Sequence, residues 1–158
     1  MRSRSAPPRP PDGAAVAAGS LDAMTDPTAP AVWPTLRATD ARALIRFLVD
    51  VVGFEETAVY GEGDVVHHAE LSWPLGGGIM LGSARDDGGA PGPTPPGACS
   101  AYIVVDEPDA LCDRVRAAGA EITVDLHDTD YGSRDFGIRD PEGNRWYFGT
   151  YRGAPRAS

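Results

Sequence analysis

The sequence predicts an α+β fold built from two tandem copies of one βαβββ unit, and three features of the pattern lead to this prediction. Helical patterns at 40–53 and 106–119 each run 13 positions, from an aspartate that can cap a helix to a glycine that can end it. The strand that closes each half recurs at an offset of 67 positions, from 78–81 to 145–148. A Gly/Pro-rich stretch, 85–98, separates the two halves. Matched helices and closing strands are typical of an internal repeat.

The first half reads as strand, helix and three strands. Asp40 is placed to cap the first helix, and Gly53 to end it. A tight turn at 74–77 joins the last two strands. The apolar residues of the helix recur at helical spacing, and they are Ala41, Leu44, Ile45, Leu48 and Val52. One strand is expected before the helix and three after it, at 33–38, 54–60, 65–73 and 78–82.

The second half repeats this order. Asp106 is placed to cap the second helix and Gly119 to end it, and the turn at 140–143 precedes the last strand. Leu111, Val115 and Ala118 form the apolar face of that helix. The strands are expected at 99–105, 120–124, 134–139 and 144–150.

These patterns divide the chain into five parts. Residues 1–31 are rich in Pro and Ala without periodicity, so a disordered tail is expected there. Its apolar stretch, 14–18, is too short for a signal peptide, and Met24 is an alternative start of the protein. The remaining parts are a first module at 32–84, a linker at 85–98, a second module at 99–152 and a C-terminal tail at 153–158.

Composition excludes several classes of partner. A net charge of −9 over 158 residues argues against nucleic acid and anionic membranes, because binding to phosphate needs clustered positive charge. No apolar run approaches the roughly 20 residues that cross a bilayer. Cys99 and Cys112 form no CxxC motif and are too few for a disulfide scaffold, which favours a reducing cytoplasm.

The repeat, the linker and the closing segment at 136–148 resemble the vicinal oxygen chelate superfamily, which includes glyoxalase I, extradiol dioxygenases and bleomycin resistance proteins. The turn Asp140-Pro141-Glu142-Gly143-Asn144, followed by an aromatic strand, carries much of this resemblance. The segment 68–71 (His-Ala-Glu-Leu) is similar to the glyoxalase/bleomycin-resistance branch. The resemblance covers 33–151. It implies paired modules with curled sheets around a pocket that is commonly formed across a homodimer.

In the metal enzymes of that superfamily, His, Gln or Glu side chains on the first and last strand of each module hold a divalent cation. The resemblance carries these positions onto Trp33 and Met80 in the first half, and onto Ser100 and Tyr147 in the second. Indole, thioether and neutral hydroxyl groups are poor ligands for a hard cation. We therefore expect neither a metal nor another cofactor.

His68 and Glu70 are the strongest candidates to restore a metal site, because alternation along the strand 65–73 places Val66, His68, Glu70 and Ser72 on one face. Two ligands are too few without a third donor, so a hydrogen-bonded pair or a polar pocket wall is the favoured interpretation. A second polar group, His127, Asp128 and Asp130, is expected in a solvated loop.

The expected pocket combines aromatic, thioether and polar side chains, a set that suits a planar or amphipathic organic molecule. The resemblance implies that Arg37 contacts a substrate anion, and the loop 131–135 is placed to cover the mouth. The predicted ligand-binding residues are Trp33, Arg37, His68, Glu70, Met80, Ser100, Tyr102, Arg134 and Tyr147.

Two functions of different class remain open from the sequence. One is a metal-independent binding protein of the bleomycin-resistance type, acting on a small-molecule ligand as a homodimer. The other is a glyoxalase-like lyase, isomerase or dioxygenase with non-standard metal ligands or none. Ser100, Cys99 and Cys112 lack the partners of a nucleophile, so no catalytic residue is predicted.

Overall fold

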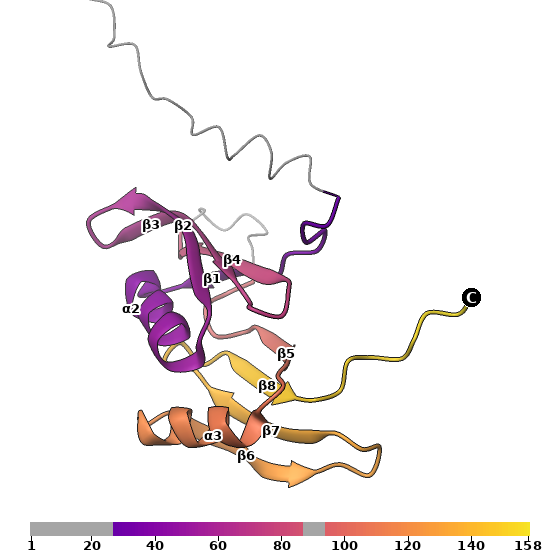
Figure 1. Cartoon of the computed structure of the whole chain (residues 1–158). Coiled ribbons are helices and arrows are strands. Elements are labelled where there is room, and N and C mark those ends of the chain that lie inside the picture. The colour runs from indigo at the N-terminus through magenta and orange to yellow at the C-terminus, as the bar shows by residue number, and fades with distance from the viewer. Residues whose placement is uncertain (1–26, 87–93) are drawn as a thin grey trace, which may run out of the picture.

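The computed structural model describes residues 27–86 and 94–158, and within them it confirms the α+β fold (Figure 1). The first four-stranded sheet has the order β1-β4-β3-β2. Its elements are β1 (Thr35–Ala38), α2 (Ala41–Arg46), the π-helix η1 (Phe47–Val52), β2 (Glu55–Glu62), β3 (Val65–Ser72) and β4 (Gly78–Ser83).

The second sheet has the equivalent order, β5-β8-β7-β6. Its elements are β5 (Ser100–Val104), α3 (Pro108–Ala117), β6 (Glu121–Asp128), β7 (Arg134–Arg139) and β8 (Arg145–Gly149). In Figure 1 each helix lies along one side of its own sheet. No described helix has the length and apolar character needed to cross a membrane.

Strand register reproduces the repeat. The parallel pair Thr35 and Met80 in β1 and β4 corresponds to Tyr102 and Tyr147 in β5 and β8. The antiparallel pairs of β3 with β4 correspond in the same way to those of β7 with β8. Every one of these partners is shifted by 67 positions, which is the offset that the closing strands predict. Side chains at equivalent positions therefore occupy equivalent places in the two sheets.

The first helical segment begins as predicted, since the Asp40 side chain accepts a hydrogen bond from the Ala43 N–H at 2.9 Å. The α-helix passes into the π-helix at Phe47, a widening that the 3.6-residue periodicity does not predict. Gly53 ends the segment in the left-handed region with φ +107°, a conformation that favours glycine.

The second helix differs from the prediction at its start. Glu107 occupies the N-cap position without a side-chain cap, and Pro108 follows as the first helical residue. Proline suits this position because its φ is already helical and its missing N–H is not needed there. Asp106 instead pairs with Arg152 at 2.8 Å, so its assignment as the cap is wrong.

Two further assignments are corrected in the strands. β6 extends to Asp128, so His127 and Asp128 lie in a strand and not in a loop. Val66 is buried in the core and does not face the pocket. The register of β2 against β3 shifts between Tyr60 and Gly61, and this irregularity breaks the strict alternation on which the prediction of Val66 depended.

Several expected segments lie outside the described residues. These are the tail up to residue 26, which includes the alternative start at Met24, and residues 87–93 of the linker.

One hydrophobic core continues through both modules. Phe54 packs edge-on against Trp73, with ring centroids 5.0 Å apart, and against Trp146 of the second module at 6.0 Å. The Trp73 Nε1–H donates to the carbonyl of Val104 in β5 at 2.9 Å. Arg114 of α3 donates from Nε to the Val51 carbonyl at 3.0 Å and also bonds Val52, so α3 holds the end of η1.

The turn between β7 and β8 is organised by Asp140, which is only 4% exposed. Its Oδ1 accepts from the N–H groups of Glu142 and Asn144, and its Oδ2 accepts from Asn144 Nδ2 and Trp146 Nε1, all within 3.0 Å. Four hydrogen bonds compensate the removal of this carboxylate from water.

We predict that Asp140→Asn lowers the free energy of unfolding by about 2–4 kcal/mol. The new amide N–H₂ would face the two donors on Asn144 and Trp146, leaving buried polar groups unpaired. Urea unfolding followed by Trp fluorescence measures the change. Asp130→Asn is the matched control, because Asp130 is exposed, and is expected to change stability by less than about 0.5 kcal/mol. Equal stability of the two variants would contradict the role assigned to Asp140.

Candidate functional site

Each sheet has one face packed against the core and one open face. In the first sheet Leu36, Leu71 and Leu81 are buried on the core side, where α2 packs. The intervening residues of these strands, such as Arg37, Glu70 and Met80, are half-buried on the other side. The residues expected to line a ligand pocket therefore belong to the open faces.

Two glycines of β4 shape the open face of the first sheet. A Cβ at Gly78 would lie 2.6 Å from the Trp33 ring, and one at Gly82 would lie 2.7 Å from the Arg37 guanidinium. Both side chains thus lie close against β4, at the glycines on either side of Met80. Trp33 precedes β1 and donates from Nε1 to the Pro30 carbonyl at 3.1 Å. A shallow hollow of about 200 Å³ lies next to them, between Arg37, His67, His68 and Met80.

His68 and Glu70 form a hydrogen-bonded pair on this face, with Nε2 and Oε1 2.9 Å apart. The Tyr60 ring stacks on His68 with centroids 6.4 Å apart. This is the hydrogen-bonded pair, one of the two interpretations that the sequence favours. The pair has a carboxylate that can orient an imidazole, so it can accept or donate a proton, and it supplies two metal donors without a third.

The open face of the second sheet is aromatic. Tyr147 is half-buried and its ring lies beside Gly137, where a Cβ would come within 3.1 Å of it. Ser100 is exposed at the start of β5, opposite Arg145. Tyr102 is paired with Tyr147 in register and is 42% exposed. These residues lie on β5 and β8, as the 67-residue offset predicts.

A hydroxyl network surrounds Asp135 on the same face. Tyr102 donates to Asp135 Oδ1 at 3.1 Å, Tyr131 donates to Oδ2 at 3.1 Å, and Ser133 also donates to Oδ1. The backbone N–H of Tyr151 donates to the hydroxyls of Tyr102 and Ser133. Desolvation, together with the hydrogen bond to Asp135, raises the pKa of Tyr131 above its ordinary value, so the phenol stays a neutral donor.

Arg134 lies on the other side of the second sheet, although it was expected in the pocket. Its Nε and Nη2 bind the Asp109 carboxylate of α3 at 2.7 and 2.9 Å, and its Nη1 binds Asp128 of β6 at 3.0 Å. The sequence of the loop 131–135 could not reveal this placement of Arg134. Neighbouring residues of a strand point to opposite faces, so Arg134 and Asp135 lie on different sides of the sheet. Arg134 therefore joins α3 to the β6–β7 hairpin.

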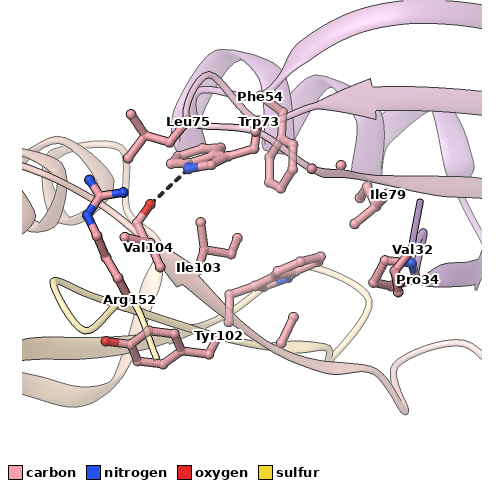
Figure 2. A pocket seen from close by; sticks show the side chains of 15 residues that line it. Val32, Pro34, Phe54, Trp73, Leu75, Ile79, Tyr102, Ile103, Val104 and Arg152 are labelled. Atoms are coloured by element: carbon pink, nitrogen blue, oxygen red, sulfur yellow. Dashed lines mark hydrogen bonds between the residues drawn. The ribbon is translucent and has the colours of Figure 1, made fainter. Parts of the chain in front are cut away.

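A larger cavity than the hollow beside Arg37 and Met80 is a cleft of about 420 Å³ between the modules (Figure 2). It lies on the core side of the sheets, where Trp73 approaches β5, and its walls are mainly apolar. Of the predicted site residues only Tyr102 borders it. The main side chains around it are Pro34, Phe54, Trp73, Leu75, Ile79, Ile103, Trp146 and Arg152.

The sequence does contain a signal for this cleft. Leu75 lies in the turn between β3 and β4 and is 45% exposed, and Trp73 lies two positions before it. A large apolar residue in a glycine-rich turn is unusual, and here it forms a rim of the cleft. The sequence pattern does not show how the two modules pack together, however, so it could not show which strand lies opposite Trp73 and Leu75.

The donors at the four superfamily metal positions do not fit a divalent cation. Trp33, Met80, Ser100 and Tyr147 offer an indole N–H, a thioether and two hydroxyls. Among residues 27–86 and 94–158, no three His, Cys, Asp or Glu side chains come together in a possible metal-binding group. Within one chain, moreover, Met80 lies in the first sheet with Trp33 against its strand β4, while Ser100 and Tyr147 lie in the second sheet.

Comparison with known proteins supports the fold. The family model of the Glyoxalase/Bleomycin resistance protein/Dioxygenase superfamily matches residues 31–148. The curated relative named "Putative glyoxylase CFP32", from Mycobacterium bovis and from Mycobacterium tuberculosis, is 31% identical over 113 residues. The match covers 70% of this chain, which spans only 41% of the length of that relative.

Solved structures show the same architecture. TioX from Micromonospora sp. ML1 superposes with a TM-score of 0.62 at 27% identity, covering 75% of this chain and 97% of TioX. TnmS3, an antibiotic binding protein from Streptomyces sp. CB03234, superposes with a TM-score of 0.56 at 22% identity, covering 72% and 88%. A superfamily member from Sphaerobacter thermophilus has a TM-score of 0.56 at 18% identity, covering 76% and 97%.

We predict that Asp109→Asn lowers stability at pH 7 and makes it less sensitive to acid. The bond from Arg134 is the largest cause that lowers the pKa of Asp109, so the carboxylate stabilises the fold above its unfolded pKa of about 3.9. That contribution is lost as the pH falls through the lower folded value. Urea unfolding at pH 7 and pH 2.5 should show a smaller difference between wild type and variant at pH 2.5. An equal difference at both pH values would contradict this role of Asp109.

Proposed function

Because the chain belongs to the glyoxalase/bleomycin resistance protein/dioxygenase superfamily, we propose that it is a small-molecule-binding protein of the bleomycin-resistance type that works without a metal. Its ligand is an aromatic or amphipathic organic molecule. The observation that carries the proposal is the replacement of chelating side chains by Trp33, Met80 and Tyr147 on the open faces of the sheets. Such side chains bind by area and stacking.

The shape of these faces supports this proposal. Gly78 and Gly137 let the rings of Trp33 and Tyr147 lie along the sheets, where their flat surfaces contribute to a binding surface. Met80 is half-buried beside Trp33, and its flexible thioether adapts to ligands of different outline. The same fold serves antibiotic binding in TnmS3. By analogy we propose a role in sequestering an antibiotic or a similar metabolite in the cytoplasm.

We propose further that the working unit is a homodimer. In one chain the candidate residues form two separate groups, one on each sheet, and no described cavity encloses both. A second copy placed with its second sheet over the first sheet of its partner would close a pocket between Met80 of one copy and Tyr147 of the other. Exposed aromatic side chains such as Tyr60 and Tyr102, 64% and 42% exposed, suit such a partner.

Independence from metal can be tested by measuring the metal content of the protein. Protein purified and dialysed without chelator should contain well below one equivalent of Fe, Ni, Zn or Mn by mass spectrometry of the elements. The variant Trp33→His/Met80→Glu/Ser100→His/Tyr147→Glu restores hard N and O donors at the four superfamily positions and should retain a divalent cation. One equivalent of tightly held metal in the wild type would overturn the proposal.

The location of the pocket can be tested with Nile red, a neutral planar dye. Wild type should bind it with increased fluorescence, whereas Met80→Arg and Tyr147→Arg should each reduce the affinity at least about tenfold, because a charge replaces apolar contact area. Mixing the two variants should restore about a quarter of the wild-type binding sites, because random exchange makes about half of the dimers heterodimers and one of the two pockets of each heterodimer is intact.

Leu75→Arg is the matched control, because it places the same charge at the rim of the cleft between the modules and should leave binding unchanged. Light scattering after size exclusion should give the mass of two chains for the wild type. Loss of Nile red binding in Leu75→Arg alone would instead assign the ligand to the cleft, and failure of the mixture to regain binding would contradict the shared pocket.

A further inference from the structure

Asp135 is a half-buried carboxylate without a cationic partner among the described residues. None of the ion pairs of the structure includes it. Its neighbour Arg134 is held by Asp109 and Asp128 on the opposite face. His127, which faces Asp135 in register, has its Nδ1 2.8 Å from the Asp125 carbonyl oxygen. Within the described part of the chain, the side-chain hydrogen bonds to Asp135 thus come from hydroxyl groups.

The backbone makes room for this arrangement. A Cβ at Gly149 would lie 1.9 Å from Asp135 Oδ1 and 2.2 Å from the Tyr102 hydroxyl. Only glycine at this position lets the carboxylate and the phenol meet above β8. Ser133, which donates to the same carboxylate, is 3% exposed. The carboxylate is therefore held in a defined place on the open face and does not move freely in solvent.

Three tyrosine rings remain uncovered around it. Tyr102, Tyr131 and Tyr151 are 42%, 61% and 45% exposed, and the last two rings meet edge-on with centroids 5.5 Å apart. Two of them, Tyr102 and Tyr131, use their hydroxyls on Asp135. Donation to a carboxylate polarises a phenol and leaves its ring more electron-rich. A carboxylate with electron-rich rings beside it is the environment that organic cations prefer.

We propose that Asp135 and the rings of Tyr102, Tyr131 and Tyr151 form a subsite for an organic cation, an amine or a quaternary ammonium group of the ligand. This inference rests on the function proposed above and names the charge of the ligand. Asp135 supplies the counter-charge and the rings supply cation–π contacts. Tyr102 also borders the apolar cleft between the modules. An aromatic part of the ligand can therefore extend from the cationic group into that cleft or along the open face. The net charge of −9 attracts such a ligand at long range.

The test uses the full chain with benzyltrimethylammonium as the cationic probe and benzyl alcohol as a neutral probe with the same ring. Titrations followed by amide NMR shifts at low salt should show tighter binding of the cation by the wild type, with the largest shifts at residues 131–135 and 149–151. Asp135→Asn keeps an acceptor but removes the charge. It should weaken binding of the cation about fivefold to tenfold and leave benzyl alcohol unchanged.

Asp130→Asn is the matched control for charge. It removes one negative charge from the adjoining loop, where Asp130 is exposed, and should change the affinity for the cation by less than about twofold because solvent screens it. Tyr131→Phe and Tyr131→Leu separate the hydroxyl from the ring, and the leucine variant should lose more affinity for the cation than the phenylalanine variant. This pair keeps the inference testable if Asp135→Asn does not fold.

Equal binding of the cation and the alcohol by the wild type would overturn the subsite, as would equal losses in Asp135→Asn and Asp130→Asn. If Nile red binds at Met80 and Tyr147 while the preference for the cation is absent, this inference fails and the proposed function stands. If neither Nile red nor either benzyl probe binds, both fail together.

Discussion

The buried carboxylate of Asp140 connects the turn between β7 and β8, the core and the neighbouring module. The positions of the sheets, and so of their open faces, depend on these connections. Its four hydrogen bonds close the turn between β7 and β8 and hold the Trp146 indole in the core. Asn144, ordered by Asp140, accepts the N–H of Cys99 just before β5. Glu142 of the same turn accepts the N–H of Asp40, the cap of α2. One turn of the second module therefore positions its own edge strand and the first helix of the other module.

The repeat explains why so much of the fold was predictable. The cap of the first helix and the closing turns are local features that follow from the residues that form them, and the offset of 67 follows from comparing the two halves. The π-helical turn at Phe47–Val52 and the cap at Glu107 were missed because they depend on packing and on Pro108. Val66 was misplaced because a single shift in register reverses the alternation of a strand, and the sequence does not mark where such a shift occurs.

The candidate site was predictable only in part, and the reason is geometric. Residues on β4 and β8 could be assigned to the open faces from alternation alone, and the hydrogen bond between His68 and Glu70 follows from their spacing of two. Arg134 could not be assigned, because its partner Asp109 lies 25 positions earlier on α3. The cleft and the convergence of Tyr102, Tyr131 and Tyr151 on Asp135 depend on long-range contacts between segments, which no local pattern contains.

The equivalent registers of the two modules show where the sequence was free to diverge. Core positions keep their character between the halves, as in Leu81 and Phe148 or Leu71 and Ile138, because both must fill the space under a helix. On the open faces His68 corresponds to Asp135, Glu70 to Gly137 and Met80 to Tyr147, with no shared chemistry. Glycine persists at 82 and 149, where Arg37 and the Tyr102–Asp135 pair respectively lie across the strand. The constraint retained on this face is thus room above the backbone, and the side chains above it can differ between the two modules without cost to the core.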